Sequence, residues 1–286
     1  MSPGPGPERL RPHPALRGTP LGFAHRGWTP AAARGDGAGD GSGDHPVAAH
    51  AWENTLAAFA AALDLGLTHL ETDVRATSDG VAVLLHDPDL ARTTGRAVPV
   101  SALTWSELGD VRVDGLHRVP RVEEVLDAFP EAVLNIDVKD ARAVRPLADA
   151  LRRADAQDRT VVAAFDGRRA RAVQHLAPGV ARSAGLAGSA GARLAAALER
   201  LSPALGRRLL ARASDGADAL QLPERAGRLT VVTPRLLDLA HQVGVQVHVW
   251  TVDDPARMDR LLDLGVDGLM SDRADLLSQV LARRAG

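Results

Sequence analysis

The feature that most constrains the fold is an alternation of strand-like and helix-like segments along most of the chain. Eight short runs rich in aliphatic residues are separated by longer stretches with apolar residues at helical spacing. The predicted strands are Leu21–His25, His69–Val74, Val133–Lys139, Val161–Phe165, Val180–Ala184, Ala219–Leu222, Val245–Val252 and Val266–Met270. The helices predicted between them include Thr55–Leu65, Val122–Phe129, Ala143–Ala154 and Arg235–Val243. This alternation predicts an α/β protein, a single (β/α)8 or TIM barrel with a parallel sheet.

A further strand-like run, Val81–His86, does not fit the alternation. It follows the second strand so closely that it cannot be parallel to it, because parallel neighbours need a crossover of a dozen or more residues. We therefore expect a β-hairpin that extends the second strand. Asp79-Gly80 favours a two-residue type I′ turn, and this turn predicts that Asp73 lies directly opposite His86.

The chain ends and one internal stretch differ from the repeating pattern. Residues 1–19 are rich in proline and predict a disordered leader, and residues 20–286 then form the barrel. Residues 29–51 contain a run of glycine and aspartate that predicts a flexible insertion between the first strand and its helix.

Composition excludes several classes of protein. The chain has no cysteine, which excludes disulfides, thiolate metal sites and a cysteine nucleophile. Its net charge is −2, and we find no basic patch that indicates a nucleic-acid partner. No run of about 20 apolar residues predicts a membrane span. We therefore expect a cytoplasmic protein that acts on a small molecule, and its oligomeric state stays open.

In a (β/α)8 barrel the functional residues lie at the carboxyl ends of the strands. The second predicted strand carries Glu71 and Asp73 on one face, and the third carries Asn135, Asp137 and Lys139 on one face. Three carboxylates that converge there would repel one another without a cation. Their oxygen atoms suit a hard ion. We therefore predict one divalent cation, Mg²⁺ or Ca²⁺ with Mn²⁺ as a further candidate, bound by Glu71, Asp73 and Asp137.

Other polar residues at the same end suit phosphoryl transfer. His25 and His86 are candidates for the general base and the general acid. Arg26 and Lys139 are candidates for neutralising a phosphate oxyanion. Trp250 either lines the pocket or packs over the barrel mouth.

An ordered set of motifs resembles one family. The motifs are His25-Arg26-Gly27, Glu53-Asn54-Thr55, Glu71–Val74, Asp79–Val81, His86-Asp87, Leu90–Gly95, Pro120–Leu126, Asn135–Lys139, Val249–Val252 and Gly265–Asp272. In this order they resemble the glycerophosphodiester phosphodiesterases, which are TIM-barrel phosphodiesterases of the phospholipase C-like type. The resemblance covers nearly all of the chain from residue 21 onward.

The resemblance implies an enzyme that hydrolyses a glycerophosphodiester to an alcohol and glycerol 3-phosphate. It implies that His25 and His86 form the acid–base pair, with metal ligands at Glu71, Asp73 and Asp137. It also implies that Arg26, Glu53 and Lys139 contact the metal–phosphate cluster or the substrate. The sequence departs from the family at Asp137, where glutamate is common, and in the 25 residues that separate the first two motifs.

Several alternatives stay open at this point. A lysophospholipase D or a sphingomyelinase D-like enzyme uses similar groups on lipid-bearing substrates. A non-catalytic barrel that binds phosphodiesters or a protein is a third possibility. The attacking group is either a glycerol hydroxyl, which gives a cyclic phosphate, or water.

Overall fold

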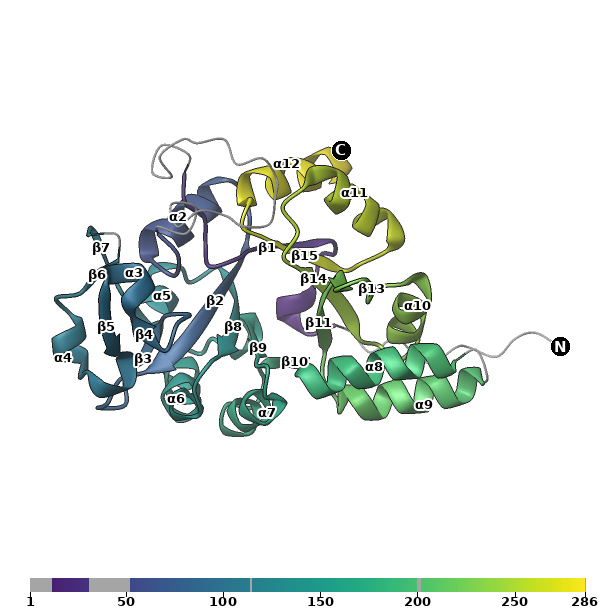
Figure 1. Cartoon of the computed structure of the whole chain (residues 1–286), viewed down its shortest axis with the longest axis horizontal. Coiled ribbons are helices and arrows are strands. Elements are labelled where there is room, and N and C mark those ends of the chain that lie inside the picture. The colour runs from purple at the N-terminus through teal and green to yellow at the C-terminus, as the bar shows by residue number, and fades with distance from the viewer. Residues whose placement is uncertain (1–11, 31–51, 114, 200–201, 286) are drawn as a thin grey trace.

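The centre of the molecule is a closed ring of eight parallel strands surrounded by helices (Figure 1). The computed structural model describes residues 12–30, 52–113, 115–199 and 202–285. The ring comprises β1 (Leu21–Ala24), β2 (His69–Ala76), β8 (Val133–Val138), β9 (Thr160–Ala163), β10 (Ala181–Ala184), β11 (Ala219–Pro223), β14 (Gln246–Trp250) and β15 (Gly268–Ser271). Strand β1 pairs with both β2 and β15, which closes the barrel. The predicted (β/α)8 fold is confirmed.

The helices begin and end close to the predicted positions, within one residue for the four that the sequence predicts. They are α2 (Leu56–Asp64), α5 (Val122–Ala128), α6 (Val144–Arg153), α7 (Gly167–Leu176), α8 (Leu186–Leu198), α9 (Pro203–Ser214), α10 (Pro234–Gln242), α11 (Pro255–Leu264) and α12 (Ala274–Ala285). Capping side chains fix several starts, as where Thr233 Oγ1 accepts the N–H of Leu236 at the start of α10. Helices α8 and α9 lie side by side at the lower right of Figure 1. None of the described helices is long and apolar enough to cross a membrane.

The alternation of side chains along each barrel strand creates two cores. Leu134, Ile136 and Val138 of β8 belong to the large core between the strands and the helices, as predicted. Inside the barrel a second core contains Phe23 and Met270 together with leucine, valine and alanine side chains. The polar residues that line the cavity therefore lie above this apolar layer, at the carboxyl ends of the strands.

The prediction that residues 1–19 are disordered is wrong for the second half of this segment. Residues Pro14–Leu16 form a short 3-10 helix, and Ala15 and Leu16 are buried in the core inside the barrel. The physical reason is that this end of the barrel needs apolar side chains to exclude water, and the leader supplies them. Residues 1–11 lie outside the described part of the chain, as do residues 31–51 of the predicted insertion.

The segment that follows β2 forms a small lobe with its own core, at the left of Figure 1. Its core contains Val83, Leu85, Leu90 and Val100, among others. The lobe and the remaining short elements are β3 (Ala82–Leu84), β4 (Asp89–Leu90), α3 (Ala91–Thr94), β5 (Arg96–Pro99), α4 (Trp105–Leu108), β6 (Arg112–Val113), β7 (His117–Arg118), β12 (Arg225–Ala226) and β13 (Leu229–Thr230), with 3-10 turns at Val100–Ala102, Ala141–Ala143 and Gln157–Arg159.

The hairpin of β2 and β3 is antiparallel, as predicted. The predicted register, however, differs from the observed one by one residue. Val74 lies opposite Leu84, and the N–H of Leu85 donates to the carbonyl of Asp73 at 3.0 Å. The loop has three residues rather than two, because Thr77 closes it by donating its N–H to the carbonyl of Val81 at 3.0 Å. Gly80 occupies the left-handed position of this loop, with φ of +81°.

Two glycines with positive φ provide a matched test of backbone packing. Gly27 has φ of +84°, and a Cβ built on it would lie 2.8 Å from the carbonyl carbon of Ala58 in α2. Gly80 has a similar φ, but a Cβ there would meet no atom within 4 Å. We expect Gly80→Ala to lose about 1–2 kcal/mol of unfolding free energy from backbone strain alone. Gly27→Ala should lose clearly more in denaturant unfolding; equal losses would contradict this packing.

A buried histidine inside the barrel predicts sensitivity to acid. His248 is fully buried against Phe23, and burial lowers its pKa to about 4, although Asp267 acts in the opposite direction. The unfolded chain binds this proton near pH 6.5 and the folded chain only near pH 4. The folded state should therefore lose stability as the pH falls through this interval, by roughly 3 kcal/mol at most.

His248→Gln removes this titration and keeps a polar side chain of similar size. We expect its unfolding free energy, measured in urea at pH 7, 5.5 and 4, to fall less with acid than that of the wild type. An equal decline in the two proteins would show that His248 does not cause the sensitivity.

Candidate active site

A cavity of about 260 Å³ opens at the carboxyl ends of the barrel strands. Its ionisable residues come from the ends of β1, β2 and β8 and from the chain just after β3. They are His25, Arg26, Glu71, Asp73, His86, Asp137 and Lys139. The structure thus brings together both predicted histidines, all three predicted carboxylates and both predicted phosphate-binding cations.

The register of the sheet explains why the carboxylates meet. In the parallel pair of β2 and β8, Asp73 lies level with Asp137 and Glu71 lies level with Asn135. Residues that are level in neighbouring strands and point inward have adjacent side chains. The two strands therefore place Asp73 and Asp137 side by side. Glu71 lies two residues before Asp73 on the same inward face of β2.

The end of β1 is shaped so that its backbone also faces the site. Arg26 has φ of +58°, which is rare for a residue other than glycine. This conformation lets the N–H of Arg26 donate to Glu71 Oε2 at 3.1 Å, while its Nε lies 3.2 Å from Asp73 Oδ2. Arg26 therefore contacts two of the predicted metal ligands, once through its backbone and once through its side chain.

Lys139 and Asn54 hold the central carboxylates from two other sides. The Lys139 ammonium lies 2.9 Å from Asp73 Oδ1 and 2.6 Å from Asp137 Oδ2. Asn54 Nδ2 donates to Asp73 Oδ2 at 3.0 Å, and Asn54 Oδ1 accepts from Thr72 Oγ1 at 2.7 Å. Both oxygens of Asp73 therefore have a partner, and the residue is only 1% exposed.

His86 reaches the cavity for a different reason from the predicted one. Strand β3 ends at Leu84, and the chain then bends, so His86 is not part of the ladder. The Arg75 guanidinium holds this bend, because its Nε and Nη2 donate to the carbonyl of His86 at 2.9 and 2.7 Å. The bend compensates for the shifted register and directs His86 inward.

The two histidines have opposite pKa shifts. Burial opposes the charged form of His25, but the carboxylates of Glu71 and Asp272 outweigh it and raise its pKa to about 9. For His86 burial is the largest influence and lowers the pKa, although Asp73 acts in the opposite direction. His25 therefore holds a proton more readily than a free imidazole, and His86 holds one less readily.

Asp73 and Lys139 stabilise each other's charges, whereas the ionised form of Glu71 is disfavoured. Burial opposes ionisation of Asp73, but Arg26 and Lys139 outweigh it and hold its pKa well below its usual range. Burial and the neighbouring Asp73 raise the pKa of Glu71. Burial opposes the charge of Lys139, but Asp73 and Asp137 outweigh it and raise its pKa.

The opposite wall of the cavity is neutral. Among the described residues that line it, every side chain from β9 through β15 is uncharged. Trp250 lies on this wall, in edge-to-face contact with Phe165 at a ring separation of 6.1 Å. The remaining polar groups include Gln221, whose Nε2 donates to Asn135 Oδ1 across the barrel at 2.7 Å.

Glu53 lies behind the cavity rather than on its wall. It is 4% exposed, and its carboxylate accepts two hydrogen bonds from Arg92, at 2.9 and 2.5 Å. Arg26 Nη1 also lies 3.5 Å from the same carboxylate. In this structure Glu53 therefore orients two arginines, and one of them lines the cavity.

Three residues that sequence reasoning did not assign also belong to the site. Asp272 bonds to His25, Asp87 bonds to His86, and Arg92 bonds to Asp87 and Glu53. Strand alternation contained the signal for Asp272, because it lies two residues after the inward-facing Met270. Asp87 and Arg92 lie in motifs that the resemblance included without a role.

The donor atoms suit a hard cation, although no complete metal shell is already arranged. The described residues contain no group of three acidic, histidine or cysteine side chains spaced to hold a metal ion. The Lys139 ammonium lies between Asp73 and Asp137 instead. Asp137 Oδ1, however, is buried without a hydrogen-bond partner. Since an unpaired buried acceptor is costly, this oxygen is the one to which a cation would add most.

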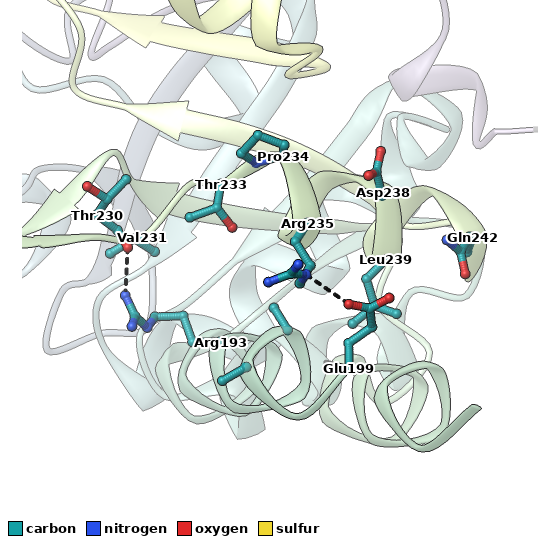
Figure 2. Close-up of a pocket in the computed structure, with 12 residues that line it drawn as sticks. Arg193, Glu199, Thr230, Val231, Thr233, Pro234, Arg235, Asp238, Leu239 and Gln242 are labelled. Atoms are coloured by element: carbon teal, nitrogen blue, oxygen red, sulfur yellow. Dashed lines mark hydrogen bonds and ion pairs between the residues drawn. The ribbon is translucent and has the colours of Figure 1, made fainter. Parts of the chain in front are cut away.

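A larger groove of about 710 Å³ lies on the outside of the molecule, between α8 and α10 (Figure 2). Two of its arginines are already bound, Arg235 to Glu199 at 2.9 Å and Arg193 to the carbonyl of Thr230 at 2.9 Å. No histidine is found among the described residues that line it. The barrel cavity, although smaller, is therefore the better candidate for an active site, because histidines, carboxylates and positively charged side chains line it together.

Comparisons with known proteins agree with this site. The profile of the glycerophosphoryl diester phosphodiesterase family matches residues 39–276. A relative from Mycobacterium tuberculosis, named probable glycerophosphodiester phosphodiesterase 2, is 42% identical over 81% of this chain and 86% of its own.

Solved structures share the fold. One from Silicibacter pomeroyi, provisionally identified as a glycerophosphoryl diester phosphodiesterase, has a TM-score of 0.70 and 25% identity and covers 95% of this chain and 97% of its own. A phosphodiesterase from Oleispira antarctica, solved with its product sn-glycerol-3-phosphate, has a TM-score of 0.69 and 19% identity over 92% of this chain and 97% of its own. The family match, the relative and the cavity agree, and this chain belongs to the glycerophosphoryl diester phosphodiesterase family.

Proposed function

We propose that this phosphodiesterase cleaves a glycerophosphodiester to an alcohol and glycerol 3-phosphate with one divalent cation and with His25 and His86 as its acid–base pair. The observation that carries the proposal is that both histidines line the same cavity as Glu71, Asp73 and Asp137. The family match supports the substrate class, and the product bound to the Oleispira antarctica relative supports glycerol 3-phosphate as the phosphate-containing product.

The phosphate group binds between the positively charged side chains of Arg26 and Lys139 and the three carboxylates. Arg26 and Lys139 both line the cavity and carry fixed positive charge, which favours the negative charge that develops on the phosphate oxygens. Glu71, Asp73 and Asp137 would hold the divalent cation. When bound, such an ion supplies additional positive charge to the phosphate oxygens. The unpaired Oδ1 of Asp137 would be one of its ligand atoms, and Lys139, which contacts Asp73 and Asp137, would lie beside the phosphate.

Proton transfer completes the reaction. One histidine removes the proton from the attacking oxygen, which belongs to water or to the neighbouring glycerol hydroxyl, as that oxygen bonds to phosphorus. The other histidine protonates the alcohol oxygen as its bond to phosphorus breaks. If the glycerol hydroxyl attacks, water then opens the cyclic phosphate to give glycerol 3-phosphate. This requires one neutral and one protonated imidazole, which matches the opposite pKa shifts of His86 and His25. On this basis His86 is the base and His25 is the acid.

The metal proposal predicts loss of activity on chelation. We expect the fully chelated protein to lose nearly all hydrolysis of glycerophosphodiesters and Mg²⁺, Mn²⁺ or Ca²⁺ to restore it. Asp137→Asn should weaken metal binding at least about tenfold in calorimetry, because it removes a charged donor.

The control for this test is Asp137→Glu, which restores the acid that is common in the family. It should bind the metal and retain activity. Full turnover by a demetallated sample, or unchanged metal affinity of Asp137→Asn, would refute the proposed metal site.

The acid–base proposal predicts large losses in kcat. General acid–base catalysis contributes about 10²–10⁴-fold, so His25→Ala and His86→Ala should each lower kcat by that factor. The circular dichroism of both variants should match the wild type, because both side chains lie at the cavity. His241→Ala is the matched control, since His241 pairs with Asp267 at the surface. A His86→Ala enzyme with normal kcat would exclude His86 from catalysis.

A further inference from the structure

Each histidine of the cavity is bound through the same ring atom by an aspartate. His25 Nδ1 lies 2.6 Å from Asp272 Oδ1, and His86 Nδ1 lies 2.8 Å from Asp87 Oδ1. An ionised carboxylate can only accept a hydrogen bond, so Nδ1 of each ring carries a proton. The atom left to exchange protons with a substrate is then Nε2, and His25 Nε2 lies 3.8 Å from Glu71 on the cavity side.

Asp272 is held in place by the chain around it. Its backbone N–H donates to Asp253 Oδ1 at 2.8 Å, and the same oxygen accepts from Ser271 Oγ at 2.8 Å. The N–H of His25 donates to the carbonyl of Ser271 at 3.0 Å. The His25 side chain is therefore joined to Asp272 and its backbone to the preceding Ser271, and Asp253 holds both Ser271 and Asp272.

Asp87 is held by a different device. Arg92 Nε donates to Asp87 Oδ2 at 2.6 Å, while the other nitrogens of Arg92 bind Glu53. The carboxylate of Asp87 thus receives Arg92 on one oxygen and His86 on the other. This leaves the His86 ring little freedom to rotate, although its side chain is 34% exposed.

We infer that Asp272 and Asp87 are positioning residues, which direct Nε2 of His25 and of His86 into the cavity and keep the proton on Nδ1. This inference rests on the proposed function, because it assigns a purpose only if the histidines exchange protons with the substrate. A carboxylate that orients a histidine in this way is a general device of acid–base and metal sites.

The test replaces each carboxylate by an amide of the same shape. Asp272→Asn and Asp87→Asn should each lower kcat at least about tenfold with KM changed less than about twofold, since neither side chain lines the cavity. Asp272→Glu, which keeps a carboxylate, should retain more of kcat than Asp272→Asn. Asp267→Asn is the matched control: it removes the charge of a carboxylate outside the cavity that contacts His241 Nε2 at 2.8 Å and accepts the N–H of Val247, and it should leave kcat unchanged.

A spectroscopic signal separates positioning from mere stability. In protein labelled with ¹⁵N-histidine, we expect the wild type to show a protonated, strongly hydrogen-bonded Nδ1 for His25, identified by its absence in His25→Gln. This signal should be lost in Asp272→Asn and kept in Asp267→Asn. The wild-type spectrum tests the geometry even if a variant folds poorly.

The outcomes distinguish this inference from the function on which it rests. If His25→Ala and His86→Ala keep normal kcat, the proposed acid–base function is wrong. If those variants lose activity but both asparagine variants keep kcat within about twofold, the function stands and the positioning role is wrong. A wild-type His25 that carries no proton on Nδ1 would also refute the role of Asp272.

Discussion

The buried carboxylate of Asp73 is the constraint on which the site depends. An ionised carboxylate that is 1% exposed is very unfavourable unless charges and hydrogen bonds surround it. Its partners come from three separate segments, with Arg26 after β1, Asn54 before α2 and Lys139 after β8. Satisfying this one group therefore fixes the loops that carry the other functional residues. The neighbouring Asp137 shares Lys139, and its unpaired oxygen leaves one position for a further positive charge.

The parts of the fold that depend on side-chain period were predictable from sequence. Alternation along the strands correctly predicted which residues of β8 face the helices and which face the cavity. The hairpin register was not predictable, because it depends on whether Thr77 or Ser78 closes the loop, and Asp79-Gly80 suits both loop lengths. The burial of Leu16 was also missed, since nothing local in a proline-rich segment indicates that a distant barrel end will cover it.

The site shows a similar division. Residues next to recognisable strand ends, such as Asp73 and Lys139, could be placed in advance because parallel strands bring their ends together. His86 reached the cavity although the argument from register failed, since the Arg75 contacts to its carbonyl depend on tertiary structure. Asp272 and Arg92 escaped notice because each acts through a partner that is remote in sequence.

The contact between His25 and Asp272 joins residues that are 247 positions apart and lie beside the first and last strands of the barrel. Contacts between such distant residues form late in folding, because much chain must already be ordered. A ribosome-bound chain would therefore carry Asp73, Asp137 and Lys139 well before it could join His25 to Asp272. The contact between His25 and Asp272 can form only once the last strand has been made and has paired with the first.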